Sequence, residues 1–165
     1  MLFGELGFKT GAEIGVAEGH YSKVLCLHVP DLKLYCVDLW DEYYRETTRI
    51  KSLEDQERCL KLAHEKLDPY GAIFIRKPSA EAAKDIPDES LDFVYIDGDH
   101  AFDHIMQDLI IWSYKVKPGG IVAGHDFYRF RGAGVVDAVE VYTRAHQIHE
   151  WFIDDQREKS FFWVK

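Results

Sequence analysis

The stretch Glu13-Ile14-Gly15-Val16-Ala17-Glu18-Gly19-His20 decides the fold of this 165-residue chain. It lies between a short apolar run and a segment with helical spacing, so it predicts a strand, a glycine-containing bend and a helix N-terminus. In an open α/β sheet this corner binds ligands. The spacing is Glu-x-Gly-x-x-x-Gly, which differs from the Gly-x-Gly-x-x-Gly of a dinucleotide pyrophosphate site. The carboxylates of Glu13 and Glu18 therefore favour a small ligand with a positive group over a diphosphate.

Strand and helix patterns alternate along the rest of the chain. Strands are expected at residues 12–16, 33–38, 72–76, 91–97, 121–123, 148–153 and 160–164. Short connections between alternating strands and helices predict a three-layer α/β/α doubly wound fold with a mostly parallel, seven-stranded sheet. The last two strands are expected to pair antiparallel, which places one antiparallel strand near the C-terminus. Since no repeat or linker interrupts the pattern, one domain over residues 1–165 is the simplest interpretation.

Composition narrows the class of protein. The chain is 47% hydrophobic and has a net charge of −9, which argues against nucleic acid or an anionic membrane as the main partner. Cys26, Cys36 and Cys59 are scattered, and an odd number of unpaired cysteines indicates reduced thiols inside the cell. No signal peptide is visible, and no apolar run approaches the ~18 residues of a membrane span. We therefore expect a cytoplasmic protein.

The second predicted strand ends at Asp38, about twenty residues after Gly19, the position of a ribose-binding acid in nucleotide-binding sheets. A carboxylate there can accept hydrogen bonds from both hydroxyls of a ribose. A strand-end aspartate that caps a turn is the structural alternative. The glycine-containing corner at Gly15 and Gly19, taken together with Asp38, favours ribose binding.

A second polar cluster, Asp97-Gly98-Asp99-His100, follows the fourth strand, and His125-Asp126 follows the next one. Because neighbouring strand ends meet, carboxylates and an imidazole should converge here and bind Mg²⁺, Mn²⁺ or a related cation. Paired carboxylates also provide a general base. The alternative is an acidic turn satisfied by backbone N–H groups. Asp103 and Asp108 are interpreted as solvent-facing charges of the following helix, and Ser79 as the N-cap of a short helix.

In these features the chain resembles a class I S-adenosylmethionine-dependent methyltransferase over nearly all of its length. Residues 13–19 match the first motif of that family, whose backbone contacts the methionine end of the cofactor, and residues 37–38 match the second, whose acid holds the ribose. Residues 91–97 and 117–121 match later motifs. The resemblance implies S-adenosylmethionine as cofactor, bound by Glu13, Gly15, Ala17, Glu18, Gly19, Asp38, Ser79, Ala80 and Asp97, with Ser79 and Ala80 at the adenine.

The segments 97–100 and 124–127 are similar to those of the macrocin-type sugar O-methyltransferases of antibiotic synthesis. In that subgroup the first acid of the Asp-Gly-Asp turn binds Mg²⁺, the second is the general base, and a later acidic pair completes the metal site. The resemblance implies Asp97 and Asp126 as metal ligands and Asp99 as the general base. From their positions at the same strand ends, we add His125 to the predicted metal site and His100 to the predicted catalytic residues. The antibiotic enzymes commonly have Asp-Asp where this chain has His125-Asp126.

The expected function is O-methylation of a small-molecule hydroxyl, with a divalent cation assisting; a homodimer is left open as the assembly. A non-catalytic S-adenosylmethionine-binding domain is one alternative, because residues 1–10 are too short to form the helical lid that relatives have before the first strand. An NAD(P)-dependent oxidoreductase is a second, but it requires Gly-x-Gly-x-x-Gly and a Tyr-x-x-x-Lys pair, and the sequence contains neither.

Overall fold

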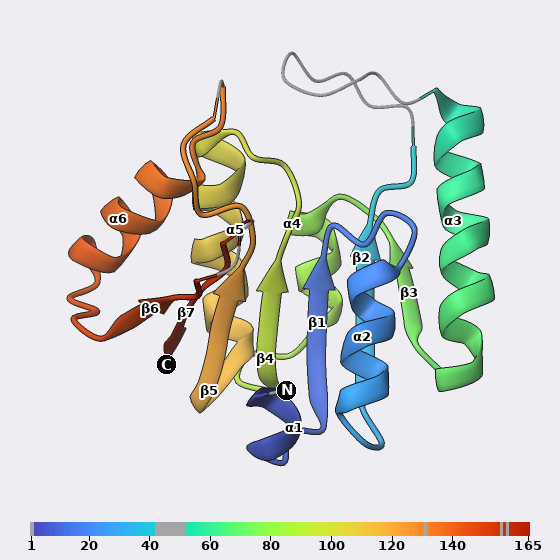
Figure 1. The fold of residues 1–165 in the computed structure, drawn as a ribbon, viewed down its shortest axis with the longest axis horizontal. Helices are drawn as coiled ribbons and strands as arrows, with labels where there is room; N and C mark the ends of the chain where they lie inside the picture. The colour runs from blue at the N-terminus through green and yellow to red at the C-terminus, as the bar shows by residue number, and fades with distance from the viewer. Residues whose placement is uncertain (1, 42–51, 131, 156, 158) are drawn as a thin grey trace.

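A computed structural model describes residues 2–41, 52–130, 132–155, 157 and 159–165. Within this part of the chain, seven strands form one sheet in the order β3-β2-β1-β4-β5-β7-β6 (Figure 1). The strands are β1 (Thr10–Ile14), β2 (Lys33–Asp38), β3 (Ile73–Arg76), β4 (Leu91–Ile96), β5 (Val116–Gly124), β6 (Trp151–Ile153) and β7 (Phe161–Val164). The strands β1 to β5 are parallel, and β7 runs antiparallel to both of its neighbours. The predicted sheet is therefore confirmed.

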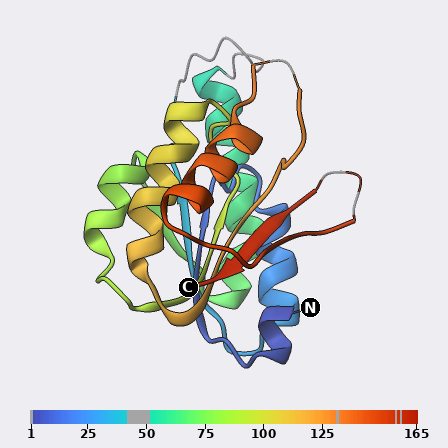
Figure 2. The ribbon, with the colours of Figure 1, turned by 90° about the vertical axis from the view of Figure 1, so that its left-hand side faces the viewer.

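Helices cover both faces of the sheet, which confirms the three layers (Figure 2). The helices are α1 (Leu2–Glu5), α2 (His20–His28), α3 (Leu53–Leu67), α4 (Ser79–Ala82), α5 (Phe102–Lys115) and α6 (Val135–Ala145), with 3₁₀ turns η1 (Asp68–Tyr70) and η2 (Ala83–Asp85). Successive residues of β4 point to opposite faces. Phe93 packs in a core with residues of α1, α2 and α3, and Val94 packs in a second core with residues of α4, α5 and α6. None of the helices in the described ranges is long and apolar enough to cross a bilayer.

Local sequence signals explain where α3 begins and ends. Ser52 is its N-cap: the side-chain oxygen accepts a hydrogen bond from the backbone N–H of Asp55 at 3.1 Å, and Asp55 reciprocates toward the backbone of Ser52. This reciprocal arrangement satisfies two donors that a helix N-terminus leaves free. At the other end Pro69 lies in the 3₁₀ turn η1, and Gly71 adopts a left-handed conformation. The helix positions Gln56 beside the cavity described below.

Several local expectations differ from the structure; the strand expected at residues 148–153, for example, begins only at Trp151. The first strand ends at Ile14, because Gly15 turns away with φ of 91°. Residues 117–120, expected as a turn, lie within β5 as an irregularity, since Val116 pairs with Leu91 while Ile121 pairs with Phe93. The N-cap of α4 is Pro78 and not Ser79, and the Ser79 hydroxyl is hydrogen-bonded to Asp108 and Trp112 of α5. None of these differences changes the topology.

The carboxyl ends of β1, β2, β3, β4 and β5 all lie at one edge of the sheet, at the top of Figure 1. The loops that follow these strands are arranged along this edge in the order of the strands in the sheet. The segment after β3 lies at one side, those after β2 and β1 follow, and those after β4 and β5 lie at the other side. Ligands of open α/β sheets bind at this edge.

Candidate active site

A cavity of about 430 Å³ opens at the carboxyl ends of these strands. Its wall is built from residues at the ends of four different strands: Gly15 and Ala17 after β1, Asp38 as the last residue of β2, Ser79 and Ala80 after β3, and Asp97, Asp99 and His100 after β4. The volume lies in the range of small-molecule and cofactor sites. The strand-end residues singled out in the sequence therefore meet around one space.

Close approach of β1 and β4 requires glycine at position 15. A Cβ atom placed on Gly15 would lie 2.2 Å from the backbone oxygen of Asp97, and the φ of 91° is one that side chains rarely adopt. Hydrogen bonds fix the bend on both sides: the Gly15 N–H donates to the Val37 oxygen at 2.9 Å, and the Asp97 N–H to the Ile14 oxygen at 2.7 Å. The loop after β1 is thereby held directly against the Asp97 turn.

Asp38 organises the cavity wall next to this bend. Its Oδ2 accepts a hydrogen bond from the Ala17 N–H at 2.8 Å, and its Oδ1 accepts one from the Trp40 N–H at 3.1 Å. The buried indole of Trp40 donates to the Ala17 oxygen at 2.8 Å. Both Ala17 and Trp40 have positive φ angles, 49° and 41°, which cost free energy in residues with side chains. A carboxylate has about four acceptor positions, so Asp38 retains capacity for ligand hydroxyls.

Three predicted cofactor residues lie outside the cavity wall. The Glu13 side chain is 2% exposed and faces α2, where the Ser22 hydroxyl donates to it. Glu18 pairs with His20 at 3.2 Å, and Gly19 is the N-cap of α2, with Leu67 of α3 beside it. The placement of Glu13 and Glu18 therefore does not support the expectation that their carboxylates face a positive group of the ligand.

Burial, with smaller contributions from Asp97 and Asp38, raises the pKa of Glu13 from 4.5 to about 8 against the lowering effect of the Ser22 hydrogen bond. Folding therefore binds a proton at pH values between these two pKa values, and stability falls as pH rises through that window. We expect Glu13→Gln to remove this pH-dependent loss of folding stability, which amounts to up to about 1.4 kcal/mol per pH unit. The variant should match the wild type near pH 5 and exceed it near pH 9 in urea unfolding. Glu65→Gln, at an exposed position of α3, is the control; a constant difference across pH would contradict the shifted pKa.

The predicted metal-binding region gathers Asp97, His100 and Asp126, whose ligand atoms all lie within 4.8 Å of one another. His100 Nε2 lies 2.8 Å from Asp126 Oδ2 and 3.9 Å from Asp97 Oδ1. His125 Nδ1 is also near, 3.7 Å from Asp97 Oδ1 and 3.3 Å from Asp126 Oδ1. Asp126 adopts a left-handed φ of 57°. The group that could hold a metal thus contains His100, predicted as catalytic, in place of His125, predicted as a metal ligand.

The environment of this cluster fits a cation. The buried His100 Nε2 makes no aligned hydrogen bond with any described residue, although a carboxylate oxygen is 2.8 Å away. Burial alone would lower the pKa of His100, but the carboxylates of Asp126 and Asp97 outweigh it and raise the pKa to about 9. Burial likewise acts to raise the pKa of Asp126, but His100 and His125 outweigh it and hold that pKa below its usual range. Two carboxylates and an imidazole in this arrangement are suitable ligands for a divalent metal.

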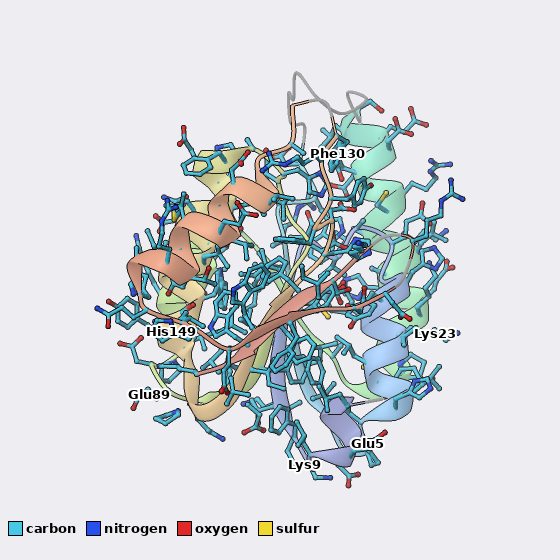
Figure 3. All side chains as sticks on the ribbon, turned by 60° about the vertical axis from the view of Figure 1, so that its left-hand side comes forward. Glu5, Lys9, Lys23, Glu89, Phe130 and His149 are labelled. Atoms are coloured by element: carbon cyan, nitrogen blue, oxygen red, sulfur yellow. The ribbon has the colours of Figure 1, made fainter. Side chains whose placement is uncertain are left out.

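Asp99 is held from two sides beside this cluster. Its Oδ1 accepts a hydrogen bond from the Ala101 N–H at 2.9 Å, and its Oδ2 lies 2.9 Å from Nδ1 of His104. Above the cluster, the loop after β5 brings the Phe130 ring edge-on to the His100 ring, with centroids 5.7 Å apart. Figure 3 labels Phe130 at the same end of the sheet. Asp99 thus lines the cavity in a fixed orientation, which suits a proton acceptor.

Helix α5 adds residues that the sequence analysis missed. His104, Gln107 and Asp108 line the cavity. The expectation that Asp108 faces solvent is wrong, because its side chain is 5% exposed and accepts a hydrogen bond from the Ser79 hydroxyl. Helical spacing was the available signal: position 108 lies on the same face as the buried Ile105 and Trp112.

Comparison with known proteins gives one family match: a model described as a methyltransferase domain matches residues 12–127. A curated relative, the uncharacterized protein y4gI of Sinorhizobium fredii, is 37% identical over 62 residues. That match covers 37% of this chain, and the chain spans about 7% of the length of this curated relative.

Solved structures share the fold. One is from Clostridium thermocellum and is provisionally described as an rRNA methylase: TM-score 0.69, 13% identity, covering 98% of this chain and 92% of that one. Another is from Staphylococcus aureus and is provisionally described as a caffeoyl-CoA O-methyltransferase: TM-score 0.68, 18% identity, covering 99% and 79%. At these identities the likeness shows the fold alone, and the two descriptions name different acceptors.

Proposed function

The chain belongs to a family of class I S-adenosylmethionine-dependent methyltransferase domains, and from this membership we propose that it methylates a hydroxyl oxygen of a small molecule. One observation supports this most strongly. The loop after β1, the Asp38 carboxylate and the Asp97–His100 cluster all adjoin a single cavity of about 430 Å³. A cofactor-binding wall and an acidic, metal-compatible cluster in one space suit methyl transfer to a hydroxyl.

The residues present fit the cofactor. Asp38 would accept hydrogen bonds from the ribose hydroxyls, and Gly15 and Ala17 after β1 line the cavity beside it. Ser79 and Ala80 would adjoin the base. Bound S-adenosylmethionine supplies a methyl group already activated by a sulfonium, so the protein mainly has to align the acceptor and remove its proton.

We propose that Asp99 takes the proton of the acceptor hydroxyl. Its contacts with the Ala101 N–H and with His104 fix the carboxylate in the cavity wall. Asp97, His100 and Asp126 would hold a divalent cation, with His125 adjacent. Such a cation lowers the pKa of a hydroxyl bound to it and fixes its position. A sugar hydroxyl is the acceptor class suggested by the macrocin-type motifs.

The test is transfer of labelled methyl groups from S-adenosylmethionine to a panel of sugars, sugar nucleotides and catechols. We expect transfer to at least one hydroxyl acceptor with Mg²⁺ or Mn²⁺ present, and a loss of more than about tenfold with a chelator. Restored activity on adding the cation back excludes damage by the chelator. Transfer that is indifferent to chelation would contradict the metal assignment. Cofactor binding without transfer to any acceptor would favour the non-catalytic domain.

A further inference from the structure

The Asp108 carboxyl has no role in the proposed transfer, yet it is a buried acid in the cavity wall. It belongs to α5 and is 5% exposed. Its Oδ1 accepts a hydrogen bond from the Ser79 hydroxyl of α4, and the Ser79 oxygen accepts one from the Trp112 indole at 2.7 Å. An indole N–H only donates, so Ser79 must use its single proton toward Asp108. The directions of the two hydrogen bonds that link Trp112, Ser79 and Asp108 are therefore fixed, and Asp108 is the acceptor.

The second carboxylate oxygen of Asp108 is available to a ligand. Oδ2 makes no hydrogen bond with any residue in the described ranges. It lies next to Gly98, where an added Cβ atom would be 3.6 Å away. Because Gly98 has no side chain and also lines the cavity, nothing at that position covers Oδ2. A hydrogen bond from a ligand donor to this charged acceptor would contribute about 1.5–3 kcal/mol.

The charge of Asp108 suits a neutral donor. Burial raises its pKa to about 6, against the lowering effects of the Ser79 hydrogen bond and of His104, while Asp99 raises it slightly. At neutral pH the group is therefore mostly ionised and can accept hydrogen bonds only. The His104 Nδ1 atom already lies 2.9 Å from Asp99 Oδ2, so the nearest imidazole is engaged with another carboxylate.

The order of the strands shows which end of the cofactor meets Asp108. In the order β3-β2-β1-β4-β5, Ser79 follows β3, Asp38 ends β2, and the Asp97 and Asp126 cluster follows β4 and β5. A nucleoside with its ribose at Asp38 and its sulfur toward the cluster has its base on the Ser79 side. Asp108 is the carboxylate that is hydrogen-bonded to Ser79.

We infer that Asp108 is a specificity-determining residue: its Oδ2 accepts a hydrogen bond from the exocyclic amino group of the cofactor's adenine. The same oxygen excludes a purine with a carbonyl at that position, because two acceptors would face each other. This inference depends on the proposed function, since it assumes that the cavity binds an adenosyl cofactor.

The test is calorimetric titration with S-adenosylhomocysteine and with S-inosylhomocysteine, in which a carbonyl replaces the amino group. A hydrogen bond to a charged acceptor contributes about 1.5–3 kcal/mol, so the wild type should prefer the adenosyl compound by about 30-fold. Asp108→Asn retains the size and the bond from Ser79, and its amide also offers a donor to the carbonyl. We expect the preference to fall below about fivefold. Asp103→Asn, at an exposed position of the same helix, should keep the wild-type preference.

A third ligand, 5′-methylthioadenosine, separates the base from the amino-acid end of the cofactor. If Asp108 contacts the base, Asp108→Asn weakens this ligand and S-adenosylhomocysteine by the same factor. If Asp108→Asn lowered the affinity for S-adenosylhomocysteine alone, Asp108 would contact the ammonium group of the ligand, and the inference would be overturned. A full preference for adenine in Asp108→Asn, with an unchanged melting temperature, would also overturn it. Failure of the wild type to bind S-adenosylhomocysteine would instead refute the proposed function.

Discussion

Asp99→Asn is expected to lower the rate of methyl transfer by about 10²–10⁴-fold, the usual contribution of a general base. Asparagine has the same shape and can still accept the hydrogen bond from the Ala101 N–H, so the turn after β4 should be preserved. It cannot take up the hydroxyl proton. The affinity for S-adenosylhomocysteine should therefore stay within about threefold of the wild type, because the change does not touch Asp38 or Gly15.

Two variants sharpen this experiment. Asp103→Asn removes a nearby exposed carboxylate of α5 and should leave turnover unchanged. His104→Gln removes the second partner of Asp99, whose Nδ1 lies 2.9 Å from Oδ2, and tests whether that contact positions the base. Full turnover by Asp99→Asn in the presence of a saturating acceptor would assign the base to another residue.

Asp38→Ala is expected to weaken binding of S-adenosylhomocysteine by about 100-fold or more. Two hydrogen bonds from ribose hydroxyls to a carboxylate contribute about 1.5–3 kcal/mol each. The substitution also removes the acceptor that holds the N–H groups of Ala17 and Trp40, two residues with positive φ. The wall beside the ligand should therefore loosen, and the melting temperature should fall.

Calorimetric titration measures this effect, and Asp88→Ala is the control. Asp88 is an exposed aspartate before β4, at the opposite end of the sheet from the cavity, where it pairs with Lys115. Its loss should not change cofactor affinity. Unchanged affinity in Asp38→Ala would refute ribose binding by Asp38, even if the protein were less stable.

The sheet could be predicted because its strands are short apolar runs bounded by strong breakers. The second strand, residues 33–38, agrees with the structure at both ends. Asp38, Asp97 and Asp99 lie at the ends of predicted parallel strands, so the sequence places all three at one edge of the sheet. These acids meet because the carboxyl ends of parallel strands all lie at the same edge of the sheet.

Side-chain direction was harder to predict. Glu13 and Gly15 both belong to the first motif, but Glu13 lies within β1 on the face covered by α2, whereas Gly15 lies beyond the end of the strand, at the cavity. Glu13 accordingly faces α2 rather than the cavity. The role of Asp108 depends on Ser79, 29 residues away in the sequence. No local pattern reveals that pair, although helical spacing could have shown that position 108 is buried.

Which imidazole lies next to each carboxylate also required coordinates: His100 is nearer to Asp126, and His125 is slightly nearer to Asp97. Both histidines follow neighbouring strands, so the sequence brings both to the same region. The left-handed backbone at Asp126 and the conformation of the turn after β4 determine the distances. Backbone conformations of this kind in non-glycine residues are uncommon and carry no reliable sequence signal.

The central claim is that the cavity between Asp38, Ser79 and Asp97 binds an adenosyl cofactor. A crystal structure of the protein grown with S-adenosylhomocysteine tests this most directly. Our account predicts the ribose hydroxyls at the Asp38 carboxylate, the base beside Ser79 and Asp108, and the sulfur toward Asp97. The ligand bound elsewhere, or a cavity left empty at millimolar ligand, would contradict the account.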